Sequence, residues 1–211
     1  MSNRPDGKLG VVLKFMGAIM PYRYIEFQAG EFYHIYHRGA NKQKIFFEAD
    51  NYLYFSRLLR RQRDRYAMNI IAYCLMPNHF HLMLQPQRRM NLSQFMGKLQ
   101  QSYVQAINWR YRRTGPLFRE RFRHVHVHGE RHQLLLCRYI HVNPKKDGLV
   151  RDLRDWPSSN YLEFIGARHG GLVVPGYREK FFATGKEYEE FVAAYGADDD
   201  NELERILAGS K

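Results

Sequence analysis

Cysteine is scarce in this chain of 211 residues: only Cys74 and Cys137 are present, and no Cys-X-X-Cys spacing occurs. A disulfide framework and a cysteine-based structural zinc site are therefore excluded, and a reducing cytoplasm fits best. Long apolar runs are lacking too, because the stretch from Leu9 to Met20 is interrupted by Lys14 and two glycines. A bilayer span takes about 20 residues, and no small-residue cleavage site follows the stretch. We expect neither a membrane span nor a signal peptide.

Acidic residues are also under-represented. Lysine and arginine number 33 against 21 aspartates and glutamates, so the formal net charge is +12 and the isoelectric point is near 9.8. Residues 185–211 hold eight acids and three bases, a net charge of −5, which leaves +17 on residues 1–184. This imbalance predicts a polyanionic partner.

The hydrophobic patterns predict an α+β fold. Alternating residues indicate strands at 31–38, 68–75, 79–84 and 121–128, with a hairpin turn at residues 76–78. Apolar spacing of three or four indicates helices at 50–65, 91–113 and 130–142; we expect Asp50 to cap the first and Asn143-Pro144 to stop the last. The order β-α-β-β-α-β-α suits an antiparallel four-stranded sheet with helices packed on it, as in ferredoxin-like and RRM-like folds.

The same patterns divide the chain into three parts. We expect an N-terminal extension at residues 1–29, a core domain at 30–150 and a C-terminal extension with an acidic tail at 151–211. Short helices are predicted within the C-terminal extension, at 186–195 and 200–208.

Two histidines stand two positions apart in an apolar, β-prone segment. His79 and His81 would project from one face of a strand, because side chains alternate with a period of two. This is the geometry of a paired metal ligand. The alternative is a surface strand that carries two histidines by chance, and the spacing alone does not separate the two interpretations.

A second pair of polar residues lies on the last predicted helix of the core. Tyr139 precedes Asn143 by four residues, so the two share a helix face and could point a hydroxyl and an amide oxygen into one site. The alternative is a half-buried aromatic, one of fifteen tyrosines, followed by a helix cap before Pro144.

Five sequence blocks resemble, in order and spacing, the REP-associated tyrosine transposases of the single-tyrosine HUH transposase superfamily. They are YHIYHRGANKQ (33–43), LMPNHFHLM (75–83), GPLFRERF (115–122), RYIHVNP (138–144) and WPSSNY (156–161). The resemblance extends over about residues 20–165. Members of the family commonly begin near the position of Met20, so residues 1–19 would be an extension or follow a misassigned start.

The resemblance implies a function and assigns roles to individual residues. Residues 30–150 would be an HUH transposase-like catalytic domain, His79, His81 and Asn143 would bind a divalent metal ion such as Mg²⁺ or Mn²⁺, and Tyr139 would be the nucleophile. The implied reaction is sequence- and hairpin-specific cleavage of single-stranded DNA, with a 5′-phosphotyrosine intermediate and a free 3′-hydroxyl. The implied partners are palindromic repeats in a bacterial cytoplasm, and both a monomer and a homodimer are compatible with the family.

Arginines interleaved with aromatic residues are candidates for DNA contact. Such a mixture suits phosphate binding together with base stacking. The candidates are Trp109, Arg110, Arg112, Arg113, Arg119, Arg121 and Arg123. A further basic run at residues 57–65 is at least as well explained as a solvated helix face.

Other histidines and other functions compete with this interpretation. His124, His126 and His128 alternate along a predicted strand and would either form a second metal cluster or face solvent or DNA. His34 and His37 would point to opposite faces of a strand, and His141 lies off the Tyr139 face of its helix.

The alternative function is a non-catalytic module that binds hairpin DNA or structured RNA. A hydrolytic phosphodiesterase would need two His-X-Ser/Thr elements, which are not evident.

Overall fold

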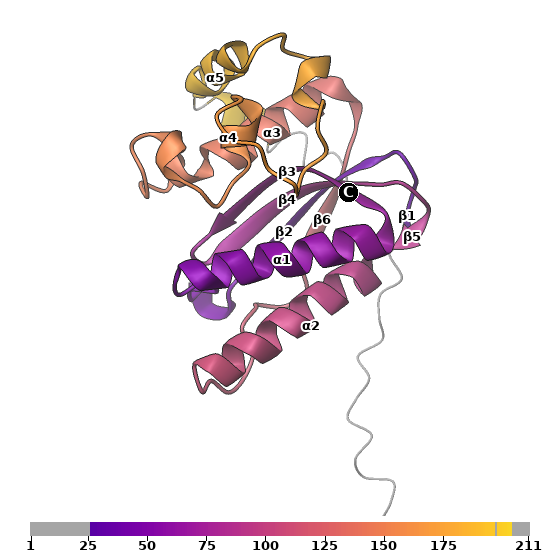
Figure 1. Ribbon diagram of the computed structural model, residues 1–211, viewed down its shortest axis with the longest axis vertical. Helices are drawn as coiled ribbons and strands as arrows, with labels where there is room; N and C mark the ends of the chain where they lie inside the picture. The colour runs from indigo at the N-terminus through magenta and orange to yellow at the C-terminus, as the bar shows by residue number, and fades with distance from the viewer. Residues whose placement is uncertain (1–25, 197, 204–211) are drawn as a thin grey trace, which may run out of the picture.

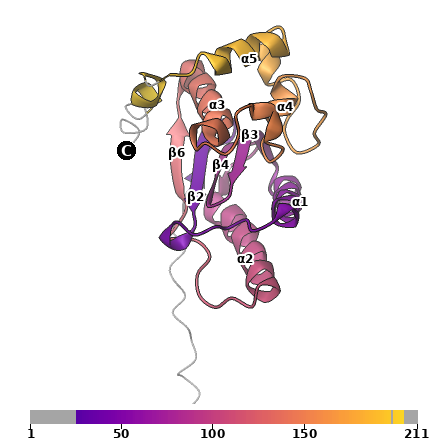
Figure 2. The same cartoon turned by 90° about the vertical axis from the view of Figure 1, so that its left-hand side faces the viewer.

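The computed structural model describes residues 26–196 and 198–203. At its centre is a four-stranded antiparallel sheet in the order β3-β4-β2-β6. Figures 1 and 2 show helices α1 and α2 on one face of this sheet and α3, α4 and α5 on the other. The predicted α+β fold is therefore confirmed. The strands are β2 (Phe32–Arg38), β3 (Met68–Met76), β4 (His79–Pro86) and β6 (Arg123–Val127); the helices are α1 (Ala49–Tyr66), α2 (Leu92–Arg110), α3 (Gly129–Lys146), α4 (Tyr161–Phe164) and α5 (Gly185–Ala193).

A small two-stranded sheet, which the patterns do not predict, lies beside the main one. Strand β1 (Glu26–Phe27) pairs with β5 (Met90–Asn91). Phe27 is fully buried, and its ring stacks on that of Tyr33 with the centroids 3.5 Å apart. The last residues of the predicted N-terminal extension thus pack against the core, while residues 1–25, including the suggested start at Met20, lie outside the described part. Three 3₁₀ helices complete the fold: η1 (Ala40–Lys42), η2 (Leu153–Asp155) and η3 (Arg178–Lys180).

The face of the sheet under α1 and α2 is a continuous apolar core. Strand alternation sends Ile35 and Phe80 toward these helices, where they meet Phe55 of α1 and Leu99 and Tyr103 of α2. The hydroxyl of Tyr103, the one polar atom in this group, donates to the carbonyl of Ile45 at 2.7 Å. Burial of these large side chains, at about 1.5–3 kcal/mol each, makes this core a main source of stability.

The C-terminal extension is held on α3 by a buried polar network. His141 Nδ1 lies 2.6 Å from the hydroxyl of Tyr188 on α5, and its Nε2 lies 2.9 Å from Oδ1 of Asn160. Asn160 in turn donates to the carbonyl of Ile71 on β3. His141 is thus a structural residue on the side of α3 away from Tyr139, as expected from its position.

Several element ends differ from the predictions. Glu48, and not Asp50, caps α1, and α2 ends at Arg110. The predicted stop of α3 at Asn143-Pro144 is wrong, because the helix continues to Lys146 with Pro144 inside it. Proline at this point removes only one hydrogen bond near the end of the helix, and the carbonyl of Asn143 still accepts from the amide of Asp147.

The predicted helices of the C-terminal extension are partly observed. The first corresponds to α5, and residues 198–203 are helical, whereas the rest of the predicted 200–208 helix lies outside the described residues. In the part of the chain that the structure describes, no helix combines the length and the apolar character needed to cross a membrane.

Candidate active site

The β3-β4 hairpin places two histidines on the α3 face of the sheet. Its strands are joined through Pro77 and Asn78, so β4 begins at His79. His79 and His81 project toward α3, and Phe80 between them enters the opposite core. The two imidazoles are 5.0 Å apart between centroids and nearly perpendicular, and both are buried. Strand alternation therefore accounts for the shared orientation of the pair.

Helix α3 brings Tyr139 and Asn143 to the same place. The half-buried ring of Tyr139 meets that of His81 edge-on, with the centroids 5.4 Å apart. Asn143 donates from Nδ2 to the carbonyl of Tyr139 at 2.6 Å, and its side chain is close enough to His79 to influence the pKa of that imidazole. Because the helix continues through Asn143, the four-residue spacing keeps both side chains on one face. Two histidines, a tyrosine and an asparagine thus converge from two elements distant in sequence.

Strand β2 adds two residues to this site that are not among the predicted site residues. His34 Nε2 lies 3.0 Å from His81 Nδ1, and Tyr36 stacks on His81 with the centroids 5.6 Å apart. Tyr36 is the cross-strand partner of His81, and His34 is its diagonal neighbour. Alternation along β2 indicates that His34 and Tyr36 share a face, but the neighbouring strand and its register come only from the tertiary structure.

Burial determines the protonation of the histidines. It lowers the pKa of His34 to about 3 and also lowers the pKa of His79 and of His81. All three imidazoles are therefore neutral at pH 7, and each has one lone pair. His79 donates from Nδ1 to Oδ1 of Asn78 at 2.6 Å, so the lone pair of His79 is on Nε2.

The donor set at this site fits a divalent metal ion. It comprises two neutral imidazoles, His79 and His81, and the amide oxygen of Asn143, which is left over when Nδ2 donates to the backbone. Nitrogen and oxygen donors of this kind suit Mn²⁺ and later transition metals, and Mg²⁺ is held by oxygen donors and phosphates. Within residues 26–196 and 198–203, no three histidine, cysteine or acidic side chains form a metal site, so a three-donor set here depends on the amide.

The predicted arginine cluster is split by the fold. Arg119 and Arg123 lie beside the site. The amide of Arg119 donates to the carbonyl of Arg38, which is paired with His79 across the sheet. The guanidinium of Arg123 lies 5.8 Å from the centroid of the Tyr36 ring. Arg121, in the same segment, is exposed. These arginines border the edge of the sheet where β2 ends.

The other candidates gather where α2 ends. Trp109 is 85% exposed, and Arg112 is exposed as well. Arg110 forms an ion pair with Glu48 at 2.5 Å, and Arg113 donates to Gln43 at 2.7 Å. Two of these four residues are thus engaged with neighbouring side chains in the protein.

The histidines of β6 do not join the site. Val125 and Val127 are paired with His34 and Phe32 on the α3 face, so His124 and His126 project from the other face. His126 pairs with Glu31 at 2.9 Å. His128 follows the strand, and its ring lies 3.9 Å from that of His126. With no three-residue metal group among the described residues, a second metal cluster here is not supported.

Acidic residues of the C-terminal extension lie along α3. Asp199 pairs with the buried Arg138, Asp200 pairs with Lys146, and Glu202 pairs with Arg131 at 2.8 Å. The ammonium group of Lys146 also lies 5.2 Å from the ring centroid of Tyr139. The acidic segment thus neutralises basic residues of α3 close to the site.

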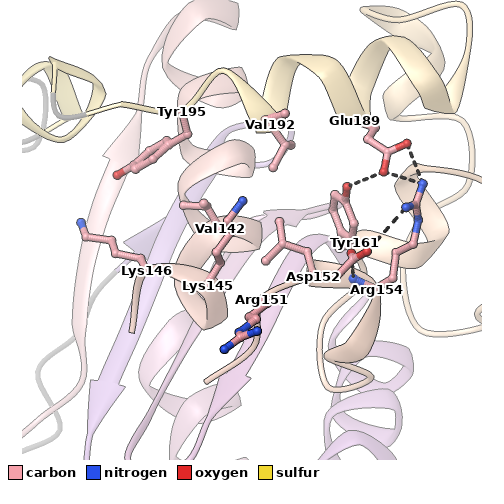
Figure 3. A pocket seen from close by; sticks show the side chains of 12 residues that line it. Val142, Lys145, Lys146, Arg151, Asp152, Arg154, Tyr161, Glu189, Val192 and Tyr195 are labelled. Atoms are coloured by element: carbon pink, nitrogen blue, oxygen red, sulfur yellow. Dashed lines mark hydrogen bonds and ion pairs between the residues drawn. The ribbon is translucent and has the colours of Figure 1, made fainter. Parts of the chain in front are cut away.

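A cavity of about 420 Å³ lies between the C-terminal end of α3 and α5 (Figure 3). Arg154 in its wall pairs with Glu189 at 2.6 Å and lies 3.6 Å from Asp152. Lys145 and Lys146 stand in the last turn of α3, where cations are favoured by the helix dipole. Acidic side chains thus compensate Arg154 and, through Asp200, Lys146, while Lys145 and Arg151 add further positive charge to the lining of this cavity.

Comparison with known proteins identifies the family to which this chain is similar. Residues 30–143 match the family model described as IS200-like transposase. A Haemophilus influenzae protein described as a REP-associated tyrosine transposase is 24% identical over an alignment of 115 residues. The match covers 49% of this chain and 65% of that protein, a little under two thirds of its length.

One of the similar solved structures has the same fold. A REP-associated tyrosine transposase bound to a REP hairpin superposes with a TM-score of 0.58 at 14% identity, covering 72% of this chain and 96% of that one. A candidate transposase from Deinococcus radiodurans has a TM-score of 0.38 at 16% identity and covers 55% of this chain and 89% of that one.

Proposed function

This chain belongs to the family of IS200-like transposases, and on that premise we propose that it nicks and rejoins single-stranded DNA beside a hairpin. Tyr139 is the nucleophile, and His79, His81 and Asn143 hold a divalent ion, Mg²⁺ or Mn²⁺. The observation that supports this most directly is the convergence of these side chains: Tyr139 packs edge-on against His81, while Asn143, one turn further along α3, lies near His79.

The reaction follows from the chemistry of the tyrosine. The Tyr139 oxygen gives up its proton to solvent and forms a bond to phosphorus, the bond between phosphorus and the 3′-oxygen breaks, and that oxygen takes up a proton from solvent to become a free 3′-hydroxyl. A phenol with a pKa near 10 is a weak nucleophile at neutral pH and needs nearby positive charge. Lys146, whose ammonium group lies 5.2 Å from the ring centroid, is close to this tyrosine but is paired with Asp200. When bound, a divalent ion would polarise the phosphate oxygens and offset the charge that develops on them.

The ligand we propose is a DNA hairpin formed by a palindromic repeat. The structural relative with a TM-score of 0.58 is bound to a REP hairpin, and the excess of basic residues in this chain suits a nucleic acid. Arg119 and Arg123, at the edge of the site, would contact phosphates of the strand that reaches Tyr139. The proposal holds for a monomer and for a homodimer.

A covalent adduct assay tests the proposal. A single-stranded hairpin oligonucleotide is incubated with the protein and Mn²⁺ or Mg²⁺, and protein-linked DNA is resolved on a denaturing gel. Tyr139→Phe removes only a hydroxyl, so it should reduce adduct formation by at least about 10³-fold and leave hairpin binding unchanged. Tyr54→Phe, on the opposite side of the sheet, is the matched control and should form the adduct normally.

Two results would contradict the proposal. An adduct that persists in Tyr139→Phe would show that another residue is the nucleophile. A wild-type protein that binds the hairpin but forms no adduct with either metal would favour the non-catalytic binding module.

A further inference from the structure

We infer that His34 is a positioning residue that sets the tautomer of His81, so that His81 presents the Nε2 lone pair to the metal ion. The inference rests on the proposed function, because it concerns the metal site assigned there. His34 lies on β2, outside the histidine pair of β4, and is not among the proposed ligands.

The contact between the two imidazoles is close and enclosed. His34 Nε2 lies 3.0 Å from His81 Nδ1, and the rings are stacked with an interplanar angle of 15°. The side chains are only 3% and 4% exposed, so water does not compete freely for these nitrogen atoms. A buried polar atom that loses its hydrogen-bond partner destabilises the fold, which strongly favours keeping this hydrogen bond.

One proton occupies this hydrogen bond, and its position decides what His81 can bind. A neutral imidazole has one N–H group and one lone pair. If His81 donates from Nδ1 to His34 Nε2, the lone pair of His81 is on Nε2 and is available to a metal. If His34 donates instead, His81 carries its proton on Nε2, and that nitrogen cannot coordinate. Metal binding through Nε2 therefore requires His34 to be the acceptor.

The other histidine of the pair is held in the same way. His79 donates from Nδ1 to Oδ1 of Asn78 at 2.6 Å, and an amide oxygen can only accept, so the lone pair of His79 is on Nε2. His34 gives His81 the acceptor that Asn78 gives His79. Removal of such a partner of a metal-ligating histidine typically weakens metal binding 10–100-fold.

The strand that carries His34 also provides a matched control. His37 is equally buried but lies on the opposite face of β2, where its Nε2 is 3.1 Å from the carbonyl of Glu120 and its Nδ1 is 2.6 Å from Gln100. Loss of His37 removes a buried imidazole and its hydrogen bonds from the same strand and does not touch His81. An effect of general destabilisation would appear in both variants.

Calorimetric titration of the full chain with Mn²⁺, without DNA, gives the first readout. His34→Phe keeps a ring but has no acceptor, and it should weaken Mn²⁺ binding about 10–100-fold. His34→Gln can place an amide oxygen where Nε2 was, so it should bind within about threefold of wild type. His37→Phe should bind Mn²⁺ as wild type does. Thermal melts of all variants verify that they are folded.

The second readout is the tautomer itself, from ¹⁵N NMR of the histidine side chains in the metal-free protein. Wild type should show His81 protonated on Nδ1, and His34→Phe should raise the population protonated on Nε2. If His34→Phe does not fold, the wild-type spectrum alone decides.

Three results would overturn the inference, and they separate it from the proposed function. Wild-type His81 protonated on Nε2, or His34→Phe with wild-type Mn²⁺ affinity, overturns only the role of His34. A wild-type protein that binds no Mn²⁺ overturns the proposed metal site, and the role of His34 with it.

Discussion

The two faces of the central sheet are built from the same strands but serve different ends. Phe80 faces α1 and α2 and is packed among aromatic and aliphatic side chains, whereas its neighbours His79 and His81 face α3 and meet Tyr139. His37 and His34 show the same division on β2. An alternation of period two lets one strand contribute to an apolar core and to a polar site, so substitutions can separate stability from activity.

Two substitutions in β4 test this division between the two faces of the sheet most strongly. Phe80→Ala empties a fully buried site on the α1 and α2 face and should lower the free energy of unfolding by about 3–5 kcal/mol in urea denaturation. His81→Ala should lower it by only about 1–3 kcal/mol, the cost of leaving His34 without its partner, yet it should abolish adduct formation. Equal losses of stability from the two substitutions would show that the faces are not functionally divided.

A smaller effect is expected on the α3 face of the sheet, where His141 makes the free energy of unfolding depend on pH. Burial lowers the pKa of His141 to about 4, below the value near 6.5 of an unfolded chain. Below pH 6.5 the unfolded chain binds a proton that the folded protein does not, so this histidine stabilises the fold at neutral pH and its contribution is lost as the pH falls toward 4.

Between the pKa of about 4 in the folded protein and the value near 6.5 in the unfolded chain, His141 should change the free energy of unfolding by up to about 1.4 kcal/mol per pH unit. Urea titrations at a series of pH values measure it, with His141→Gln as the comparison. A variant with the same pH slope as wild type would show that His141 does not titrate as described.

The smallest expected effect is on the salt dependence of DNA binding, and it distinguishes the arginines beside the site from those at the end of α2. Arg123 borders the site, while Arg110 is already paired with Glu48. Arg123→Ala should reduce the salt dependence of hairpin binding by about one phosphate contact, a change of about 0.7–0.9 in the slope of log K against log salt. Arg110→Ala should change the slope less. Fluorescence anisotropy at several salt concentrations makes the measurement, and a larger change for Arg110 would place the DNA along the end of α2 instead.

Local patterns in the sequence determine much of this protein. Alternation places His79 and His81 on one face, helical spacing aligns Tyr139 with Asn143, and the order of elements indicates the antiparallel sheet. Each of these depends on residues a few positions apart, whose geometry the backbone dictates. The predicted end of α3 is wrong because a proline near the end of a helix removes only one hydrogen bond, and the packing around α3 offsets this loss.

The tertiary structure alone decided which strands and helices became neighbours. The contact of His34 with His81 requires β2 to lie beside β4 in one register, and the division of the arginines depends on where the segment after α2 crosses the end of β2. The pairing of Asp199 and Asp200 with α3 joins residues more than 50 positions apart. Such contacts depend on burial and charge summed over the whole fold, and no local pattern in the chain encodes them.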